Sequence, residues 1–388
     1  MNNKSKKILF IGKRSFHSLG NYDYEYLKRL SQSQVNASIF FACSSLYDQK
    51  LIDGIKYMKL FNYNNLSQIK KFFSYLNSLL KILKFIKKNK PDAIHLQWLL
   101  FPLIDLIWLK TIKFIGWEGL VIITIHNAKS RKSRITNFFL NCCYKEINHF
   151  VVHSSKCKEY LISKYKFLKS NSIYEGRHGL INLKTNESLK KDELKIFSLI
   201  CKLRKKYKNI YIYIGNLSIY KGFDLLLQSW NIYKEKSQDN NNSALIILGK
   251  ADKSIRKFLL KNKIYDDSII YYNSFVSDQI INLSVDQSDF ILLLHRYISH
   301  SGIHSSLLSK YKTFIYNNNK NNHMLSHEYF KKTGIPFNNS ISSLSNLFYM
   351  IEKKKIKINL NSKDWANAMK YFSWENSFPD HLLNKIYK

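Results

Sequence analysis

A lone lysine in a short loop bounded by glycines is the clearest place where this sequence could hold an anion. The stretch YIYIGNLSIYKGFDLLLQSW (Tyr211–Trp230) begins as an apolar run, breaks at Gly215 and Asn216, and regains helical spacing after Gly222. It predicts a strand, a loop with Lys221 and a helix start. Backbone N–H groups at a helix N-terminus and an ammonium suit a phosphate. An ordinary strand-to-helix turn with a surface lysine would give the same pattern.

Histidines close three other apolar runs, PDAIHLQW, LVIITIHN and FVVHS, where they are His95, His126 and His153. Each run predicts a buried strand that ends in polar residues. The carboxyl ends of parallel strands share one edge of a sheet, and ligands bind there. A single histidine at such a position is more often a hydrogen-bonded structural residue. Three at equivalent strand ends favour a shared site.

Alternating strands and helices must position these residues. The apolar run KILFIG starts the series, the polar segment Lys13–Tyr22 is expected to be a loop over the sheet edge, and the alternation restarts after a Lys/Glu-rich segment at 183–208. The pattern predicts an α/β fold with two doubly wound, Rossmann-like parallel-sheet domains that face a cleft. We expect domains at residues 1–185 and 186–364, and a helical segment at 365–388 that packs back on the first domain.

Composition limits the class of protein and its partners. With 388 residues and 45% hydrophobic residues, two domains with buried cores are expected. The net charge of +35 predicts a surface that attracts nucleotides, nucleic acid or acidic lipids. Basic residues are scattered and form no RNA-binding signature, so nucleic acid ranks below the other two. The segment 66–89 reads as an amphipathic core helix with a lysine rim, or as a helix on an anionic membrane surface. Its expected apolar face consists of Ile69, Phe72, Phe73, Leu76, Leu79, Leu80, Leu83 and Ile86.

Cysteine usage and hydropathy indicate a cytoplasmic protein, with peripheral contact at the inner membrane face as an option. The five cysteines show no paired spacing and no zinc pattern, which fits a reducing compartment. The apolar run near the N-terminus is too short for a signal peptide. Charged residues interrupt 96–117, the stretch nearest in character to a membrane span.

Taken in order, these motifs resemble the GT-B glycosyltransferases, and the large family 4 group in particular. PDAIHLQW is similar to that family's DVVHxH strand, ITIHN to TxHD, VVHSS to its SxxxxxxL segment, and RHG to xHGV. In the second half, YIGNLSIYKGFDLLLQSW is similar to GRLxxxKGxDxLLxA, LIILGK to LxIxGxG, and FVSDQIINLSVDQSDFILLL to GxVsxxxLxxxYxxADxxvxPS. The resemblance runs over most of the chain.

The resemblance implies transfer of a sugar from a nucleotide diphosphate sugar to a glycan or lipid-linked acceptor during surface polysaccharide assembly. The nucleotide sugar is a co-substrate, and no cofactor or metal is expected. Lys221 and the helix start at Gly222 would stabilise the leaving phosphate, with Lys250 or Arg177 as auxiliaries. The family's equivalent of His126 contacts the donor sugar, and a histidine could also be the base for the acceptor hydroxyl.

Two departures from the family pattern concern the donor side. Asn216 stands where the family has an arginine, and Ile298 and Ser306 stand where it usually carries two glutamates. A run of hydroxyls and a glycine fills that region, and it could still hold a phosphate or a sugar. The resulting donor-binding candidates are Gly215, Asn216, Lys221, Gly222, Lys250, Ser299, Ser301, Gly302, Ser305 and Ser306.

The acceptor side is expected on the first domain. His17 and Asp23 are further candidates for the base, and Trp98 is either a sugar-stacking residue or an ordinary core tryptophan. The acceptor-side candidates are His17, Asp23, Gln97, Trp98, Asn127, Arg131 and Arg177.

Two other functions remain open at the level of sequence. The missing glutamates favour an inactive GT-B shell that binds a glycan, a nucleotide or a partner transferase. The charge alone suggests a nucleic-acid-binding protein, whose binding would depend strongly on salt.

Overall fold

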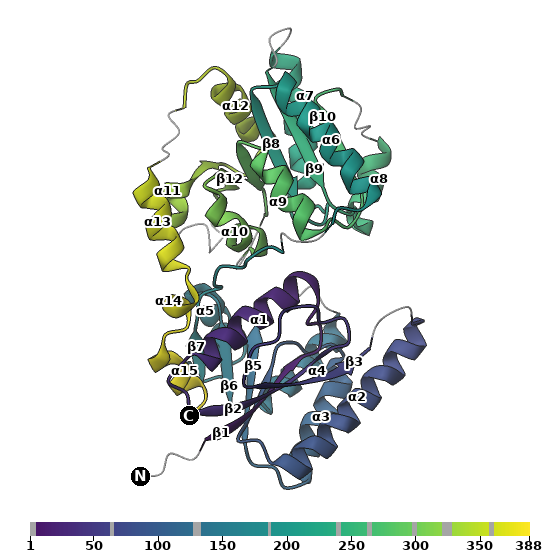
Figure 1. The fold of residues 1–388 in the computed structure, drawn as a ribbon, viewed down its shortest axis with the longest axis vertical. Helices are drawn as coiled ribbons and strands as arrows, with labels where there is room; N and C mark the ends of the chain where they lie inside the picture. Colours follow the sequence, from purple (N-terminus) through teal and green to yellow (C-terminus); the bar gives the residue numbers. More distant parts are fainter. Residues whose placement is uncertain are drawn as a thin grey trace. The chain divides into compact units, whose positions relative to one another are not determined.

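The chain forms two compact units (Figure 1). The computed structural model describes residues 5–62, 66–126, 133–184, 188–237, 242–261, 266–296, 301–319, 328–356 and 361–388. The first unit comprises residues 1–181 and 372–388, and the second comprises residues 182–371. These divisions differ from the expected boundaries at 185/186 and 364/365. Helix α13 (Ser362–Tyr371) contacts α11 (Glu328–Thr333) and so belongs to the second unit.

The first unit contains a sheet of seven parallel strands in the order β3-β2-β1-β4-β5-β6-β7. The strands are β1 (Lys6–Gly12), β2 (Ala37–Ser44), β3 (Ile55–Phe61), β4 (Ala93–Leu96), β5 (Leu120–Ile125), β6 (His149–Val152) and β7 (Ile173–Glu175). The helices are α1 (His17–Ser31), α2 (Gln68–Asn89), α3 (Pro102–Phe114), α4 (Arg134–Lys145), α5 (Ser155–Lys164), α14 (Trp374–Ser377) and α15 (Asp380–Ile386), with a 3-10 turn at Ser170–Ser172. The strand order reverses between β1 and β4, and this reversal opens the carboxyl edge of the sheet to a ligand.

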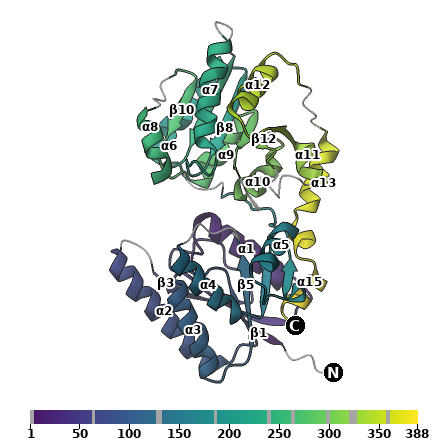
Figure 2. The same ribbon diagram turned by 180° about the vertical axis from the view of Figure 1, so that it is seen from behind.

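Alternate residues of this sheet enter two hydrophobic layers, as the period of two requires. Leu9 and Ile123 pack in the layer with α2, α3, α4 and α5. Phe10 and Ile122 pack in the other layer, which contains α1 and the C-terminal helices α14 and α15. Figure 2 shows α2, α3 and α4 on the first unit from behind. Because helices cover both faces, the strands are near-continuous apolar runs in the sequence.

The second unit contains six parallel strands in the order β10-β9-β8-β11-β12-β13. The strands are β8 (Asn209–Ile214), β9 (Ser243–Leu248), β10 (Ile269–Tyr272), β11 (Phe290–Leu293), β12 (Thr313–Asn317) and β13 (Gly334–Phe337). Besides α11 and α13, the helices are α6 (Lys191–Lys206), α7 (Phe223–Ser237), α8 (Lys253–Lys261), α9 (Asp278–Asp286), α10 (Gly302–Leu307) and α12 (Ile341–Glu352), with a 3-10 turn at Leu308–Lys310. The order again reverses beside the first strand of the unit, between β8 and β11.

The predicted pair of parallel-sheet α/β domains is confirmed, with local differences. The expected loop at Lys13–Tyr22 is shorter, because α1 already begins at His17. The expected C-terminal helical segment at 365–388 consists of three helices, α13, α14 and α15, of which α13 begins slightly earlier, at Ser362. Helix α13 ends at Tyr371 and the chain then joins the first unit, so this region divides between the two units.

Candidate functional site

The predicted anion loop, residues 215–222, joins β8 to α7 in the second unit and is called the lysine loop below. Gly215 and Gly222 both have positive φ, +116° and +72°, a region that favours glycine. A Cβ on Gly215 would lie 2.7 Å from Nζ of Lys221, and a Cβ on Gly222 would lie 2.3 Å from the carbonyl oxygen of Leu294. Both glycines are therefore favoured by conformation, and Gly222 is also required by space, because its close neighbour is a backbone atom.

The loop closes on itself through backbone hydrogen bonds. The N–H groups of Lys221 and Phe223 donate to the carbonyl oxygen of Ser218, at 3.1 and 3.2 Å, and the N–H of Gly222 donates to that of Ile219 at 3.1 Å. The Ser218 hydroxyl also accepts from the N–H of Lys221 at 3.3 Å. Three donors that the sequence assigned to a phosphate are thus used within the loop, and the ammonium is the group best suited to an anion.

The ammonium of Lys221 lies over Gly215, and its side chain is half-buried. Among the residues that the structure describes, no carboxylate forms an ion pair with it. Burial lowers the pKa of Lys221 below its usual value. The positive charge in turn adds to burial in lowering the pKa of His295. Because a partly desolvated cation without a carboxylate gains most from an arriving anion, this geometry suits a phosphate.

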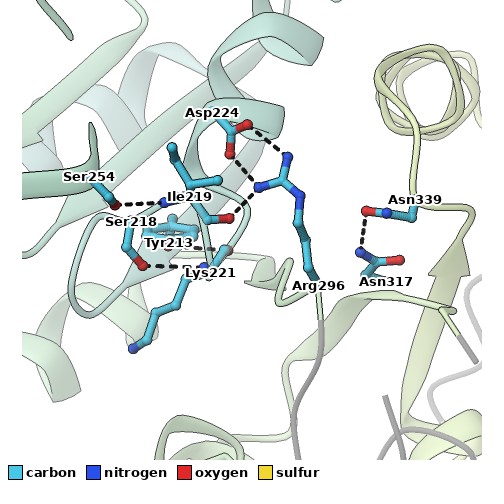
Figure 3. Close-up of polar contacts among 9 residues, drawn as sticks. All are labelled: Tyr213, Ser218, Ile219, Lys221, Asp224, Ser254, Arg296, Asn317 and Asn339. Carbon is cyan, nitrogen blue, oxygen red and sulfur yellow. Dashed lines mark hydrogen bonds and ion pairs between the residues drawn. The ribbon is translucent and has the colours of Figure 1, made fainter. Parts of the chain in front are cut away.

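An ion pair that the sequence did not indicate braces the lysine loop (Figure 3). Arg296 binds both carboxylate oxygens of Asp224, at 2.8 and 2.7 Å, and donates to the carbonyl oxygen of Ile219. Its backbone N–H donates to the carbonyl oxygen of Tyr220 at 3.1 Å. The segment after β11 is thereby tied to the loop and to the start of α7. Asp224, three residues after Lys221, is the residue that could have indicated the ion pair. Its partner Arg296 is remote in the sequence, so the pair could not be predicted.

The remaining donor-side candidates are placed unequally. Asn216 and Lys250 are both exposed. The carbonyl oxygen of Lys250 accepts from the N–H of Leu217 at 3.0 Å, so its backbone lies beside the loop. Ser301 caps α10 by accepting from the N–H of His304 at 3.3 Å. The other described candidates in this region also differ: Gly302 is exposed, Ser305 buried and Ser306 half-buried. Ser299, like Ile298, lies outside the described residues.

The three predicted histidines lie in the first unit on the sheet face that α1, α14 and α15 cover. His95 and Gln97 point to this face at the end of β4, and Thr124 and His126 do so at the end of β5. The ring of His153 follows β6, with its centroid 5.4 Å from that of His126. The same alternation that places Phe10 and Ile122 in the core places these polar groups at the carboxyl edge. The sheet therefore brings the three together.

His126 is a buried ring held on two sides. Its Nε2 lies 2.9 Å from Oε1 of Gln97. Trp98 stacks on it, with centroids 4.5 Å apart and ring planes 13° apart, and the edge of Tyr22 meets it at 4.8 Å. Burial, with smaller contributions from His153 and other histidines, holds the pKa of His126 well below its ordinary value. The ring is therefore neutral at physiological pH.

The other acceptor-side candidates are partly separate from this cluster. Asp23 lies buried in α1, and burial raises the pKa of its carboxyl to about 8. Arg177 donates to the carbonyl oxygen of Asn376 in α14. His17 is the first residue of α1, but its side chain is outside the part that the structure describes. Asn127 and Arg131 also lie outside the described residues.

A buried ion pair at the end of β1 also had no clear signal in the sequence. Nζ of Lys13 lies 2.6 Å from Oδ1 of Asp105 and 2.7 Å from the hydroxyl of Tyr75, which donates to the same carboxylate oxygen. Oδ2 of Asp105 accepts from the N–H of Phe101 at 3.0 Å. Both ionic side chains are 0% exposed. Asp105 neutralises the charge of Lys13, so the role of the pair is to link β1 to α2 and α3 and not to bind a ligand.

The described residues contain neither a metal cluster nor a membrane span. No group of three or more histidine, cysteine, aspartate or glutamate side chains there could hold a metal ion. No helix in the described ranges has the length and apolar character needed to cross a membrane.

Comparison with known sequences gives one partial relative. No protein-family model matches the chain. A protein described as an uncharacterized glycosyltransferase, MJ1059 of Methanocaldococcus jannaschii, is 28% identical over 223 residues. The match covers 53% of this chain and 52% of that protein, so the chain spans about half the length of this curated relative.

Comparison with solved structures covers nearly the whole chain. The lipopolysaccharide outer core galactosyltransferase WaaB is 14% identical, with a TM-score of 0.61 over 98% of this chain and 99% of that one. HepE of Anabaena, solved with UDP-glucose, is 12% identical, with a TM-score of 0.65 over 98% of each chain. WaaG, a glycosyltransferase involved in lipopolysaccharide biosynthesis, is 9% identical, with a TM-score of 0.62 over 98% of each chain. The predicted resemblance is confirmed: the chain has the GT-B fold and is similar to the glycosyltransferases built on it.

Proposed function

We propose that the chain is a glycosyltransferase that moves a hexose-like sugar from a nucleotide diphosphate to a glycan or lipid-linked acceptor in bacterial surface polysaccharide assembly. The observation that carries the proposal is the half-buried ammonium of Lys221 over Gly215, with no carboxylate partner among the described residues. WaaB and HepE, one a lipopolysaccharide galactosyltransferase and one solved with UDP-glucose, have the same fold and support this assignment.

In the proposed reaction the glycosidic bond breaks and negative charge grows on the departing nucleotide phosphate. Lys221 stabilises that charge more strongly in the transition state than in the bound donor, which lowers the barrier. His126 contacts the transferred sugar through a neutral ring, or receives the proton of the acceptor hydroxyl. Positive charge comes from the protein, and the proposed reaction is independent of metal.

A thermal-shift screen against UDP-, GDP- and ADP-linked sugars, with and without EDTA, tests the donor side. A bound donor raises the unfolding temperature by mass action. Lys221→Ala is expected to abolish the shift, whereas Lys205→Ala, which removes an exposed lysine of α6 in the same unit, is expected to retain it. No shift with any donor contradicts the proposal. A shift without hydrolysis or transfer supports instead the inactive binding module that the missing glutamates suggest.

We also propose that the first unit rests on anionic lipid at the cytoplasmic face of the plasma membrane. Helix α2 buries Tyr75, Leu79 and Ile82, yet Phe73 and Leu80, which were expected on that core face, are 63% and 57% exposed. Exposed apolar side chains continue on α3 and α4, and α3 contacts both α2 and α4. They include Leu103, Ile107, Phe114, Ile135 and Phe138.

Exposed lysines accompany this apolar surface, and their charge selects the occupant. Those on α2 are Lys70, Lys81, Lys84, Lys87 and Lys88. Apolar side chains beside lysines suit insertion at an anionic headgroup layer better than binding to a basic or neutral surface.

Sedimentation with vesicles tests this surface. Binding to phosphatidylglycerol vesicles and not to phosphatidylcholine vesicles is expected, and Phe73→Ser with Leu80→Ser is expected to weaken it about tenfold or more. The control is Leu260→Ser, which removes an 83% exposed leucine from the second unit. Equal loss in the control, or equal binding to both lipids, contradicts the proposed surface.

A further inference from the structure

A continuous chain of hydrogen bonds joins the C-terminal end of the protein to His126. Beyond the contact of His126 with Gln97, Nε2 of Gln97 lies 3.2 Å from Oγ1 of Thr124. The same hydroxyl lies 2.8 Å from Nε2 of His95, and Nδ1 of His95 lies 2.6 Å from the hydroxyl of Tyr387. Tyr387 follows the last helix, so residues remote in sequence meet on one face of the sheet.

The two links that Gln97 makes each have one allowed direction. Oε1 of Gln97 can only accept, so Nε2 of His126 carries the ring proton and donates. Nε2 of Gln97 can only donate, so the Thr124 hydroxyl accepts from it. The hydroxyl can then donate its own proton to Nε2 of His95. Burial lowers the pKa of His95 to about 3, so this ring is also neutral. In that arrangement its single proton is on Nδ1 and is donated to the hydroxyl of Tyr387.

Contacts within the first unit hold the end of the hydrogen-bond chain that lies at Tyr387. Nζ of Lys6 donates to the carbonyl oxygen of Tyr387 at 2.7 Å, and Nδ1 of His149 lies 2.7 Å from that of Ile386. Arg29 of α1 binds Asp380 at the start of α15 at 2.6 Å. The Tyr387 hydroxyl is also 3.3 Å from that of Tyr26 in α1. These contacts hold Tyr387 in place at the end of the hydrogen-bond chain.

We propose that Thr124, His95 and Tyr387 are positioning residues that hold His126 as its Nε2–H tautomer. Nδ1 of His126 then carries the lone pair, the atom with which a neutral ring accepts a hydrogen bond from a sugar hydroxyl or a proton from the acceptor. The orientation of the ring and the choice of nitrogen are set by partners that touch no substrate. This inference rests on the proposed function for its catalytic meaning, but the tautomer is a property of the protein alone.

Long-range proton–nitrogen NMR of histidine-labelled protein reads the tautomer directly, without substrate. The wild type is expected to show His126 protonated at Nε2. Thr124→Val keeps the shape and removes the hydroxyl, and Tyr387→Phe keeps the ring and removes the terminal acceptor. Both are expected to populate the Nδ1–H form. Thr124→Ser, which retains the hydroxyl, and Tyr26→Phe, which lies beyond the end of the chain, are expected to match the wild type.

Kinetics on the same variants separate positioning from structural damage. Thr124→Val and Tyr387→Phe are each expected to lower kcat about tenfold and to leave the KM for the donor unchanged, as when a supporting hydrogen bond is removed. Thr124→Ser is expected to restore kcat. A wild-type ring protonated at Nδ1, or one tautomer in every variant, overturns the inference. A changed tautomer with unchanged kcat overturns its catalytic meaning. A changed tautomer in a protein that transfers no sugar sustains the positioning and rejects the proposed function.

Discussion

The two candidate sites, one in each unit, prepare their reacting groups in opposite ways. In the first unit His126 is buried and neutral, and its proton is placed by side chains from β4, β5 and the C-terminal end. In the second unit Lys221 is half-buried and carries the charge, and its loop satisfies its own backbone donors. One site therefore depends on a long internal network and the other on a short braced loop.

Desolvation explains why His126 can be fully buried whereas Lys221 cannot. Burial keeps the pKa of His126 low, and a neutral ring is the form that accepts a hydrogen bond. The same burial works against Lys221, whose pKa it lowers toward loss of the charge that a phosphate needs. The lysine loop must therefore stay partly open. Its rigidity comes from the Arg296–Asp224 pair, which lies outside the site of the ammonium.

The largest expected effect tests whether the charge of Lys221 is essential. Lys221→Met keeps most of the length and the apolar character of the side-chain stem and removes the charge. Turnover of the nucleotide sugar is expected to fall by about 10²–10³, the usual loss when one electrostatic contact to a developing anion is removed. Steady-state kinetics with the donor found in the thermal-shift screen measures it. Lys205→Met is the matched control, and a loss below about tenfold in Lys221→Met would contradict the role.

Asp23 tests whether burial in the first unit favours neutral groups in general. Burial raises the pKa of this carboxyl from its ordinary value of 3.8 to about 8. Below about pH 4 the carboxyl is protonated in both the folded and unfolded chains. Between about pH 4 and 8 only the unfolded chain loses the proton, so the free energy of unfolding falls as pH rises, and above about pH 8 it levels off. Asp23→Asn stays neutral throughout and removes this dependence.

Asp23→Asn is therefore expected to be more stable than the wild type at about pH 8, by on the order of a few kcal/mol, and nearly equal to it at about pH 4.5. Denaturant unfolding across this pH range measures the difference. Asp53→Asn, which changes an exposed carboxylate in the same unit, should leave the wild-type slope in place. A difference for Asp23→Asn that does not grow with pH would refute the raised pKa.

The sequence predicts the strands and loops of both sites better than the hydrogen bonds and ion pairs within them. The strand ends at His126 and Gly215 could be read because apolar runs, glycine breaks and helical spacing are local signals. The partners Tyr387 and Arg296 could not, because only the tertiary fold brings them to the His126 network and to Asp224. The second unit ends at residue 371 rather than at the expected 364, and no local signal shows which unit a helix joins.

The burial of individual residues in apolar helices was the hardest feature to predict from the sequence. Asp105 lies in the most apolar helix of the first unit and was seen only as an interruption of it, whereas the structure buries it against Lys13. The prediction for helix α2 was wrong in the opposite direction, because it buried residues that the structure exposes. Its apolar residues were assigned to one core face, yet Phe73 and Leu80 are exposed. Periodicity shows which residues share a face, but not how many faces a helix buries.

A smaller effect is expected at the brace of the lysine loop. Arg296→Lys keeps the positive charge but cannot bind both oxygens of Asp224 in a fork. We expect a loss of about 1–3 kcal/mol in stability and a donor affinity several-fold weaker, because the loop is held less firmly. Thermal unfolding and donor titration measure the two quantities. The NMR signals of His126 should not change, and a variant with wild-type stability and affinity would show that the brace is dispensable.

The smallest expected effect separates the two sites by salt. Donor binding at a partly open cation should weaken a few-fold between about 0.05 and 0.5 M sodium chloride, because screening acts on charges that solvent reaches. The tautomer of His126 should be constant over the same range, since its links join neutral, buried groups. Donor titration and histidine NMR at matched salt concentrations measure both. A salt-dependent tautomer would show that solvent ions reach the network, and salt-independent donor binding would remove Lys221 from its proposed place beside the phosphate.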